Sequence, residues 1–320
     1  MGHRTSTPEE LFSSACDGDR GALARVLSLL ERGGEPARVL GRLSYPKSGA
    51  AYTVGLTGAP GSGKSTLTSA IIGHLRKLGM DVTVLAIDPS SPFTGGAILG
   101  DRVRMQDHAT DEGVFIRSMA TRGHLGGLSL ATPEAIRLLD AVGRRNIFVE
   151  TVGVGQVEVE IAGKADTTVV VLNPGWGDSV QANKAGLMEI ADIFVINKAD
   201  RKGVEETRRD IEQMLELGDM PHDAWQPPIV RTIGTTGEGV PELWDHISQH
   251  RATIESSGAL TERRSFRLRE EMRAIVTQRL EQRAKELCTG DRWEQLQAEV
   301  LSHSTDPWAA ADEMLRGIGA

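Results

Sequence analysis

The sequence predicts an α/β fold with a mostly parallel central sheet covered by helices, and with helical arms at both ends. Three observations support this fold class. Between residues 52 and 248, short apolar segments rich in β-branched residues alternate with helical segments. A glycine-rich loop joins the first of these strands to a helix, and purely helical segments flank the alternating region. We expect an N-terminal helical arm at 1–45, a central α/β domain at 46–255 and a C-terminal helical arm at 256–320.

The composition limits the classes of function. At 320 residues, of which 39% are apolar, the chain is long enough for a sizeable core. A formal net charge of −8 gives no basic surface field, so we expect no nucleic acid partner. No apolar run is long enough to span a bilayer, and Cys16 and Cys288 lie too far apart in sequence to form a short metal or redox motif. We expect a cytoplasmic protein without membrane association.

Residues 1–45 are predicted to form short helices. Thr7, Pro8 and Glu10 have the form of a capping box with proline at the first helical position. Gly33 is placed to end the second helix. Because no catalytic combination of side chains occurs here, we expect this arm to pack on the central domain or on a partner.

Seven segments of the central region are predicted to be strands, since they are short, largely apolar and rich in β-branched residues. Loops at the carboxyl ends of parallel strands form the ligand site of such sheets, so motifs in those loops carry the functional prediction. The segments are Thr53–Thr57, Val82–Ile87, Val114–Ile116, Ile147–Thr151, Thr168–Leu172, Ile193–Ile196 and Ile229–Thr232.

The loop after the first strand fits the pattern G-x-x-x-x-G-K-[ST], which indicates the phosphate-binding loop of a P-loop NTPase. Its small residues let backbone N–H groups turn inward on phosphate oxygens, and the following helix N-terminus favours negative charge. Lys64 can reach the β- and γ-phosphates, and the Ser65 hydroxyl can ligate Mg²⁺. The residues predicted to hold the nucleotide here are Gly58, Ala59, Pro60, Gly61, Ser62, Gly63, Lys64, Ser65 and Thr66.

Asn197-Lys198-Ala199-Asp200 directly follows another buried strand and predicts recognition of guanine. The Asp200 carboxylate can accept from both N1–H and the exocyclic amine of guanine, whereas adenine offers no such pair of donors. Asn197 can bond the base or tie neighbouring loops together, and the Lys198 stem can cover the ring. After the last strand, the N–H of Gly234 could contact guanine O6. The sequence therefore predicts a G domain that binds GTP and GDP.

Three carboxylates lie where Mg²⁺ could sit: Asp88, Asp101 and Glu150. Glu150 ends a strand and begins the sequence Glu-Thr-Val-Gly, which resembles the D-x-x-G switch of guanine-nucleotide proteins with Glu in place of Asp. In that interpretation Glu150 holds the Mg²⁺ shell and acts in catalysis, and the N–H of Gly153 senses the γ-phosphate.

Two further residues are candidates for hydrolysis itself. Gln156 is the amide nearest to the switch glycine and could orient water, and Lys184 could stabilise transition-state charge. Arg102 and Arg104 share the second possibility with Lys184. Each of these cations could equally be a surface ion-pair partner.

The C-terminal arm contains a helical stripe of apolar residues between Phe266 and Cys288, including Met272, Val276 and Leu280. Such a stripe usually packs in a core. Because this one follows a complete α/β domain, it could instead be presented to a second subunit. We favour a homodimer.

Several motifs occur together and in order, and their combination resembles the MeaB/MMAA family of GTPases, also called ArgK-type proteins. Motif agreement extends from about 50 to 240, with similar helical arms at both ends. The motifs are the phosphate loop, Ile87–Ser91, Gly95–Arg102, Thr121–Gly127, Glu150–Gln156 and Asn197–Asp200.

The resemblance implies a GTPase chaperone that gates adenosylcobalamin loading and protects methylmalonyl-CoA mutase from inactivation. It also implies a homodimer joined through the C-terminal arm. In such a protein Lys64, Ser65, Asp88, Asp101 and Glu150 would surround phosphates and Mg²⁺, and Asn197 and Asp200 would read guanine. The additional switch of the family matches Gly177, Asp178, Gln181 and Lys184.

Two alternative functions remain open from the sequence. One is an ATP- or GTP-dependent kinase linked to lysine, arginine and ornithine transport, against which the guanine motif argues. The other is a GTPase that inserts nickel or cobalt, against which the absence of a Cys/His cluster in the sequence argues.

Overall fold

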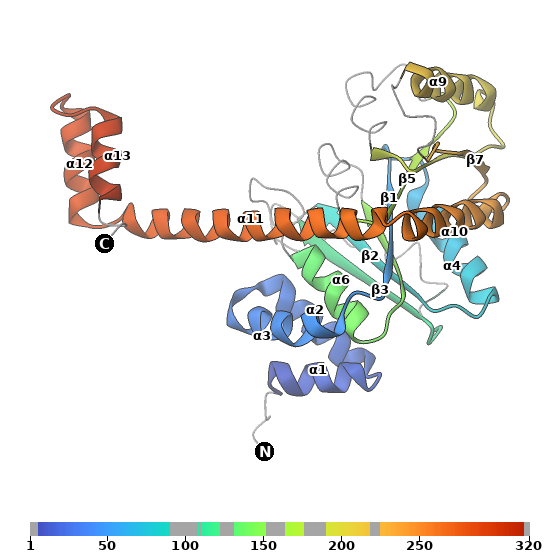
Figure 1. The fold of residues 1–320 in the computed structure, drawn as a ribbon, viewed down its shortest axis with the longest axis horizontal. Helices are drawn as coiled ribbons and strands as arrows, with labels where there is room; N and C mark the ends of the chain where they lie inside the picture. The colour runs from blue at the N-terminus through green and yellow to red at the C-terminus, as the bar shows by residue number, and fades with distance from the viewer. Residues whose placement is uncertain are drawn as a thin grey trace. The chain divides into compact units, whose positions relative to one another are not determined.

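The computed structural model describes residues 6–89, 108, 110–121, 131–151, 164–175, 190–217 and 225–316 (Figure 1). The chain divides into two compact units, Met1–Arg264 and Ser265–Ala320. Among the described residues, no helix combines the length and apolar character needed to cross a membrane.

The first unit is built on a seven-stranded sheet in the order β3-β2-β4-β1-β5-β6-β7, and every neighbouring pair is parallel. The predicted parallel α/β fold is therefore confirmed. β4 lies between β1 and β2, with Glu150 level with Leu56 and Ala86. The strands are β1 (Tyr52–Thr57), β2 (Val82–Pro89), β3 (Val114–Thr121), β4 (Asn146–Thr151), β5 (Thr167–Leu172), β6 (Ile193–Asn197) and β7 (Ile229–Thr232).

β3 extends further than its apolar run predicts. Arg117 and Ser118 interrupt the apolar pattern after Ile116, but β3 stays paired with β2 up to Pro89 and Thr121. Arg117 is accommodated because its guanidinium donates to the Glu31 carboxylate and to Ser28 Oγ at 3.0 Å. The ion pair with Glu31 of α2 (Arg20–Arg32) thus lets a charged residue occupy a position in β3 where the sequence pattern predicts an apolar one.

Helices cover both faces of the sheet (Figure 1). Side chains alternate between the two faces along each strand, so Phe148 packs on one side and Ile147 and Val149 on the other. One face carries α4 (Lys64–Lys77) and α10 (Val240–Ser256). The opposite face carries α1 (Pro8–Cys16), α2 (Arg20–Arg32), α3 (Gly34–Ser44), α6 (Ala131–Ala141) and α9 (Val204–Leu217), with the short 3₁₀ turn η1 (Tyr45–Lys47) after α3.

The N-terminal helices begin and end as their capping residues predict. Thr7 Oγ1 accepts from the Glu10 N–H at 3.2 Å, and Glu10 Oε2 accepts from the Thr7 N–H at 3.0 Å, which confirms the capping box. Gly33, with φ of 74°, separates α2 from α3. Buried residues of these helices join the same core as Leu85 and Ile147 of the sheet.

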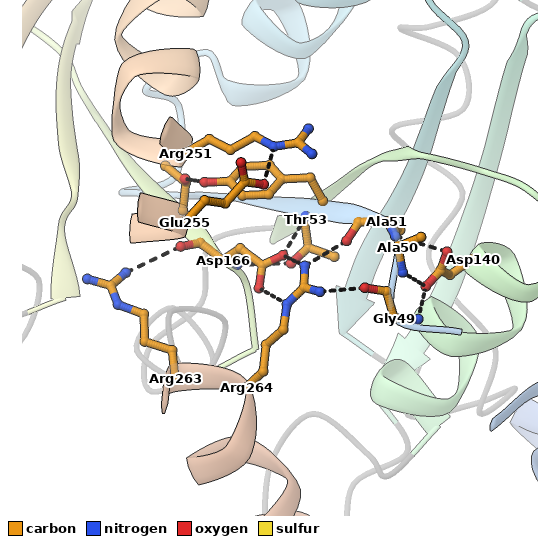
Figure 2. A network of polar contacts seen from close by, with 12 residues as sticks. Gly49, Ala50, Ala51, Thr53, Asp140, Asp166, Arg251, Glu255, Arg263 and Arg264 are labelled. Carbon is orange, nitrogen blue, oxygen red and sulfur yellow. Dashed lines mark hydrogen bonds and ion pairs between the residues drawn. The ribbon is translucent and has the colours of Figure 1, made fainter. Parts of the chain in front are cut away.

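A network of carboxylates and arginines lies at the amino ends of β1 and β5 (Figure 2). Arg264, in the first turns of α11 (Ala259–Leu287), donates to the Asp166 carboxylate through Nε at 3.1 Å and Nη2 at 2.6 Å. The same guanidinium donates to the carbonyl oxygens of Gly49 and Ala51 at 2.8 and 2.7 Å. Asp140 accepts from the N–H groups of Gly49, Ala50 and Ala51. The chain entering β1 is therefore fixed by two buried carboxylates and one arginine.

The second unit is helical. It contains most of α11 together with α12 (Asp291–Leu301) and α13 (Pro307–Leu315), which an ion pair between Arg292 and Glu313 connects at 2.8 Å. The predicted helix over 266–288 is confirmed up to Leu287. The apolar stripe of α11 is solvent-exposed, with exposed fractions between 56% and 67% for Phe266, Met272, Val276 and Leu280.

Candidate functional site

The glycine-rich loop lies between the end of β1 at Thr57 and the start of α4 at Lys64, as its motif requires. Two of its glycines have backbone conformations and surroundings that exclude a side chain. At Gly58, φ is 136° and a Cβ atom would overlap the carbonyl oxygen of Val171. At Gly63, φ is 93° and a Cβ would overlap the Asn197 amide. Glycine is therefore required at these two positions by close packing of the loop on the backbone of β5 and on the side chain of Asn197 at the end of β6.

Lys64 is buried and folds over its own loop. Its Nζ donates to the carbonyl oxygen of Gly58 and, at 3.2 Å, to that of Ala59. The ammonium group thus lies inside the curve of the loop, at the N-terminus of α4. A cation in that position can exchange carbonyl contacts for phosphate oxygens without leaving the loop.

Glu150, at the end of β4, is fully buried and is held by two hydroxyl groups of α4. Ser65 Oγ donates to Glu150 Oε1 at 2.7 Å, and Thr68 Oγ1 donates to Glu150 Oε2 at 2.8 Å. The sequence prediction placed Ser65 and Glu150 at one site, and the structure brings them into direct contact. Thr68 is a residue that the sequence reasoning missed.

Asn197 joins the phosphate loop to the loop after β7. Its Nδ2 donates to the carbonyl oxygens of Ser62 and Gly63 at 2.9 and 3.3 Å. Its Oδ1 accepts from Thr232 Oγ1 at 3.1 Å and from the Gly234 N–H at 3.0 Å. Of the two roles considered for this side chain, the structure has it tying loops together. The Gly234 N–H, which the sequence suggested for guanine O6, is bonded to this Asn197 oxygen in the structure.

The rest of the Asn-Lys-Ala-Asp turn is shaped by the backbone. Lys198 has a φ of 59°, unusual for a residue with a side chain, and its Nζ donates to the carbonyl oxygen of Gly61 at 2.5 Å. The Ala199 N–H donates to the carbonyl oxygen of Thr232 at 3.0 Å. Asp200 is exposed at the end of this turn, where its carboxylate is accessible to a ligand.

Several predicted site residues lie wholly or partly outside the described part of the structure. Asp88 lies in β2 with its backbone opposite Ala120, and its side chain is outside the described part of the structure. The other predicted residues that lie outside the described ranges are Asp101, Arg102, Arg104, Gly153, Gln156, Gly177, Asp178, Gln181 and Lys184.

The missed residues are buried polar side chains that support the motif residues. Thr68 lies three positions after Ser65, so both face the same side of α4. Thr232 is the last residue of β7 and has no exposed surface. The signal that could have found Thr68 is its polar side chain at helical spacing from the apolar residues Ile71, Ile72 and Leu75 on the buried face of α4.

Comparison with known proteins agrees with this geometry. Residues 23–289 match the family described as methylmalonyl Co-A mutase-associated GTPase MeaB. A protein of Pyrococcus abyssi named as a GTPase is 52% identical over 312 residues, which are 97% of this chain and 96% of the relative.

A mouse relative and a solved structure are also similar to this chain over nearly its whole length. The mouse protein named methylmalonic aciduria type A homolog, mitochondrial, is 33% identical over 328 residues, covering 97% of this chain and 79% of the relative. A crystal structure of an LAO/AO transport system kinase, 27% identical, superimposes over the whole of both chains with a TM-score of 0.72.

The family match covers far more than half of the chain, and it includes the phosphate loop, Glu150 and the Asn-Lys-Ala-Asp turn. The resemblance inferred from the motifs is therefore confirmed. The chain is a guanine-nucleotide-binding GTP hydrolase, and it belongs to the MeaB family of methylmalonyl-CoA mutase-associated GTPases.

Proposed function

We propose that this GTPase uses Mg²⁺ and that its nucleotide state controls the loading of adenosylcobalamin onto methylmalonyl-CoA mutase and protects the mutase from inactivation. The observation that carries the proposal is the contact of Glu150 with Ser65 at 2.7 Å. It joins the phosphate loop to the end of β4, from which the Glu-Thr-Val-Gly sequence continues. A change at the nucleotide can therefore reach the chain beyond β4.

The residues present fit a magnesium ion. Ser65 and Glu150 offer a hydroxyl and a carboxylate oxygen side by side, and Mg²⁺ prefers a few protein oxygens completed by water and phosphate. When bound, Mg²⁺ would neutralise charge on the β- and γ-phosphate oxygens. Asp88 and Asp101 remain proposed members of the same site.

The other roles that we propose follow from position. Lys64 and the N–H groups of the phosphate loop bind the β- and γ-phosphates, and Asp200 reads the guanine edge. Asn197 and Gly234 support the base site by holding its loops in register. Gly153, Gln156 and Lys184 keep the roles predicted from the sequence: sensing the γ-phosphate, orienting water and stabilising transition-state charge.

The proposed partner rests on relatedness. The family is described as mutase-associated, and the mouse relative is named for methylmalonic aciduria. We propose cytoplasmic action as a homodimer that buries the exposed stripe of α11, whose side chains Met272 and Leu280 are each at least 60% exposed. A light-scattering mass of one 34.5 kDa chain would contradict the dimer.

The test measures GTP hydrolysis and cofactor loading in one reaction. The purified chain is mixed with cofactor-free methylmalonyl-CoA mutase and adenosylcobalamin, with GTP, GDP or a non-hydrolysable GTP analogue. We expect cofactor loading to depend on which nucleotide is present, and hydrolysis to rise when the mutase is added. Equal loading with all three nucleotides would contradict the proposal.

Two variants make this test specific. Lys64→Ala should abolish hydrolysis and the nucleotide dependence of loading, because it removes the cation inside the phosphate loop. Lys77→Ala changes an exposed lysine at the other end of α4 and should leave both unchanged. With γ-labelled GTP, the label should appear as free phosphate. Label transferred to a protein would instead support the kinase alternative.

A further inference from the structure

Thr68 makes a contact that the nucleotide-binding motif does not include. Its side chain is fully buried on α4, one turn beyond Lys64. Its Oγ1 is 2.8 Å from Glu150 Oε2 and 3.0 Å from the carbonyl oxygen of Lys64. A hydroxyl has one proton to donate, and a carboxylate is a stronger acceptor than a carbonyl. The bond to Glu150 is therefore the stronger of the two.

This contact determines how the carboxylate is turned. Ser65 binds Oε1 and Thr68 binds Oε2, so the two oxygens are held by hydroxyls three residues apart on one helix. With both oxygens bonded, the carboxyl plane is fixed and Oε1 faces Ser65. A carboxylate held by Ser65 alone could rotate about its last bond and turn Oε1 away from the site.

We propose that Thr68 is a positioning residue of the magnesium site, and that its hydroxyl keeps Glu150 turned toward the ion and the Ser65 hydroxyl. This inference rests on the proposed function, since it takes Ser65 and Glu150 as the residues at Mg²⁺. The hydroxyl of Thr68 contacts Glu150 and the Lys64 carbonyl oxygen, so it would act on the ion through the carboxylate. It acts by pre-organising a carboxylate at the end of β4, the strand that leads into the Glu-Thr-Val-Gly sequence.

A purely structural role predicts a different result. Threonine in a helix commonly bonds the carbonyl four residues back, and here the Lys64 carbonyl is within that reach. If that bond were its purpose, losing the hydroxyl would affect helix stability and leave the metal dependence of nucleotide binding unchanged. The two roles are therefore separated by measuring affinity as a function of Mg²⁺ concentration.

The experiment uses Thr68→Val, which keeps the shape of the side chain and removes the donor, and Thr68→Ser, which keeps the donor. Affinity for a fluorescent GDP is measured by titration in EDTA and at increasing Mg²⁺. We expect the Mg²⁺ concentration needed for tight binding to rise about tenfold in Thr68→Val, as for the loss of one hydrogen bond to a charged group. Affinity in EDTA should be unchanged, and Thr68→Ser should restore the wild-type Mg²⁺ dependence.

Thr83→Val is the matched control. Thr83 is also fully buried, and within the described part of the chain its Oγ1 has no hydrogen-bond partner. The same substitution should therefore leave the Mg²⁺ dependence at its wild-type value. All variants are checked by thermal unfolding, and should Thr68→Val fail to fold, Thr68→Ala is compared with Thr68→Ser in the same way.

Two outcomes would overturn the inference. One is a shift in Mg²⁺ dependence of less than twofold in the variants without the hydroxyl. The other is a shift of equal size in Thr68→Ser, because the methyl group would then be the part that matters. Failure of the proposed function is distinguishable, since wild-type protein would then bind GDP equally well in EDTA and in Mg²⁺.

Discussion

At the amino ends of β1, β5 and β6, buried aspartates meet arginines and backbone N–H groups, whereas at the carboxyl end of β4 the buried Glu150 meets two hydroxyls. Asp166 accepts from Arg264 and from the Thr53 N–H at 3.0 Å. Glu150 accepts from Ser65 and Thr68. Both carboxylates are almost completely buried, with exposed fractions of 1% and 0%.

The difference lies in what each set of donors can do next. A guanidinium or a backbone N–H can only donate, so a carboxylate between such groups has fixed partners. A hydroxyl can turn, and its oxygen can accept a hydrogen bond or ligate a cation. The amino edge of the sheet, where Asp166 and Asp192 lie, is therefore built to hold the fold together. The carboxyl edge, where Glu150 lies, has contacts that can be exchanged when nucleotide and the proposed Mg²⁺ bind.

The largest expected effect is on the amino edge. Asp166→Asn replaces a carboxylate oxygen by an NH₂ group that must face Arg264 or the Thr53 N–H, both of which can only donate. We expect the free energy of unfolding to fall by about 3 kcal/mol, because breaking a buried pair leaves its partner uncompensated. Chemical denaturation of the two proteins measures the loss.

The double variant Asp166→Asn with Arg264→Leu tests whether the loss of stability comes from the broken pair. Removing both partners should cost less than the sum of the two single changes, because no charge is then left unpaired. Additive losses would show that Asp166 and Arg264 act independently, and the amino edge would no longer differ from the carboxyl edge in the way described.

Glu150→Gln makes the same chemical change at the other edge. The partners of Glu150 are the side-chain hydroxyls of Ser65 and Thr68, and either hydroxyl can turn so that its oxygen accepts a hydrogen bond from the new NH₂ group. We therefore expect the free energy of unfolding to change by less than about 1 kcal/mol. GTP hydrolysis should fall about 100-fold, since the negative charge proposed to hold Mg²⁺ is lost. Turnover and chemical denaturation are measured on the same preparation. A large loss of stability with intact turnover would mean that Glu150, like Asp166, mainly holds the fold together.

The sequence predicts the carboxyl edge better than the amino edge, for a physical reason. Phosphate and guanine impose their own geometry on short stretches of chain, so Gly58 to Ser65 and Asn197 to Asp200 form recognisable motifs. Strands are predicted because a sheet covered on both faces needs continuous apolar runs. β3 extends beyond its predicted end because the ion pair of Arg117 with Glu31 lies outside any such pattern.

The amino edge has no comparable signal. Arg264 bonds to the carbonyl of Gly49, 215 positions earlier in the chain, and to Asp166, 98 positions earlier. Any arginine or aspartate could satisfy that geometry if the fold placed it there, so no spacing marks these residues in advance. Thr68 lies between these two extremes of predictability. It is close to Ser65 in sequence, but Glu150, the residue whose orientation it is proposed to fix, is 82 positions away.

The contribution of Asp192 to stability at the amino edge is expected to depend on pH. Burial alone would raise the pKa of Asp192, but the hydrogen bond and charge of His250, the charge of Arg263 and the Thr168 N–H together lower it below its ordinary value. A carboxyl with a lowered folded-state pKa contributes stability above its unfolded value of about 3.9, and loses that contribution as pH falls through the folded value. We expect the free-energy difference between wild type and Asp192→Asn to be largest above about pH 5.

Denaturation curves between about pH 2 and pH 6 measure this difference. It should shrink as the pH falls from about 4 through the lower pKa of the folded protein, below which both proteins carry an uncharged group at this position. A difference that stays constant over the whole range would mean that the shape of the side chain, rather than its charge, fixes the amino end of β6.

The smallest expected effect comes from an ion pair at the same edge that is open to solvent. Arg251 Nε donates to Glu255 Oε1 at 2.7 Å, as short as the contacts inside the network, but the two side chains are 42% and 44% exposed (Figure 2). Glu255→Gln should lower the free energy of unfolding by less than about 0.5 kcal/mol, and less still at high salt. Chemical denaturation at low and high ionic strength measures this. If Glu255→Gln cost as much as Asp166→Asn, burial would not be what separates the two pairs. The contrast between the edges would then have to rest on the number of donors around each carboxylate, which is larger for Asp166 than for Glu255.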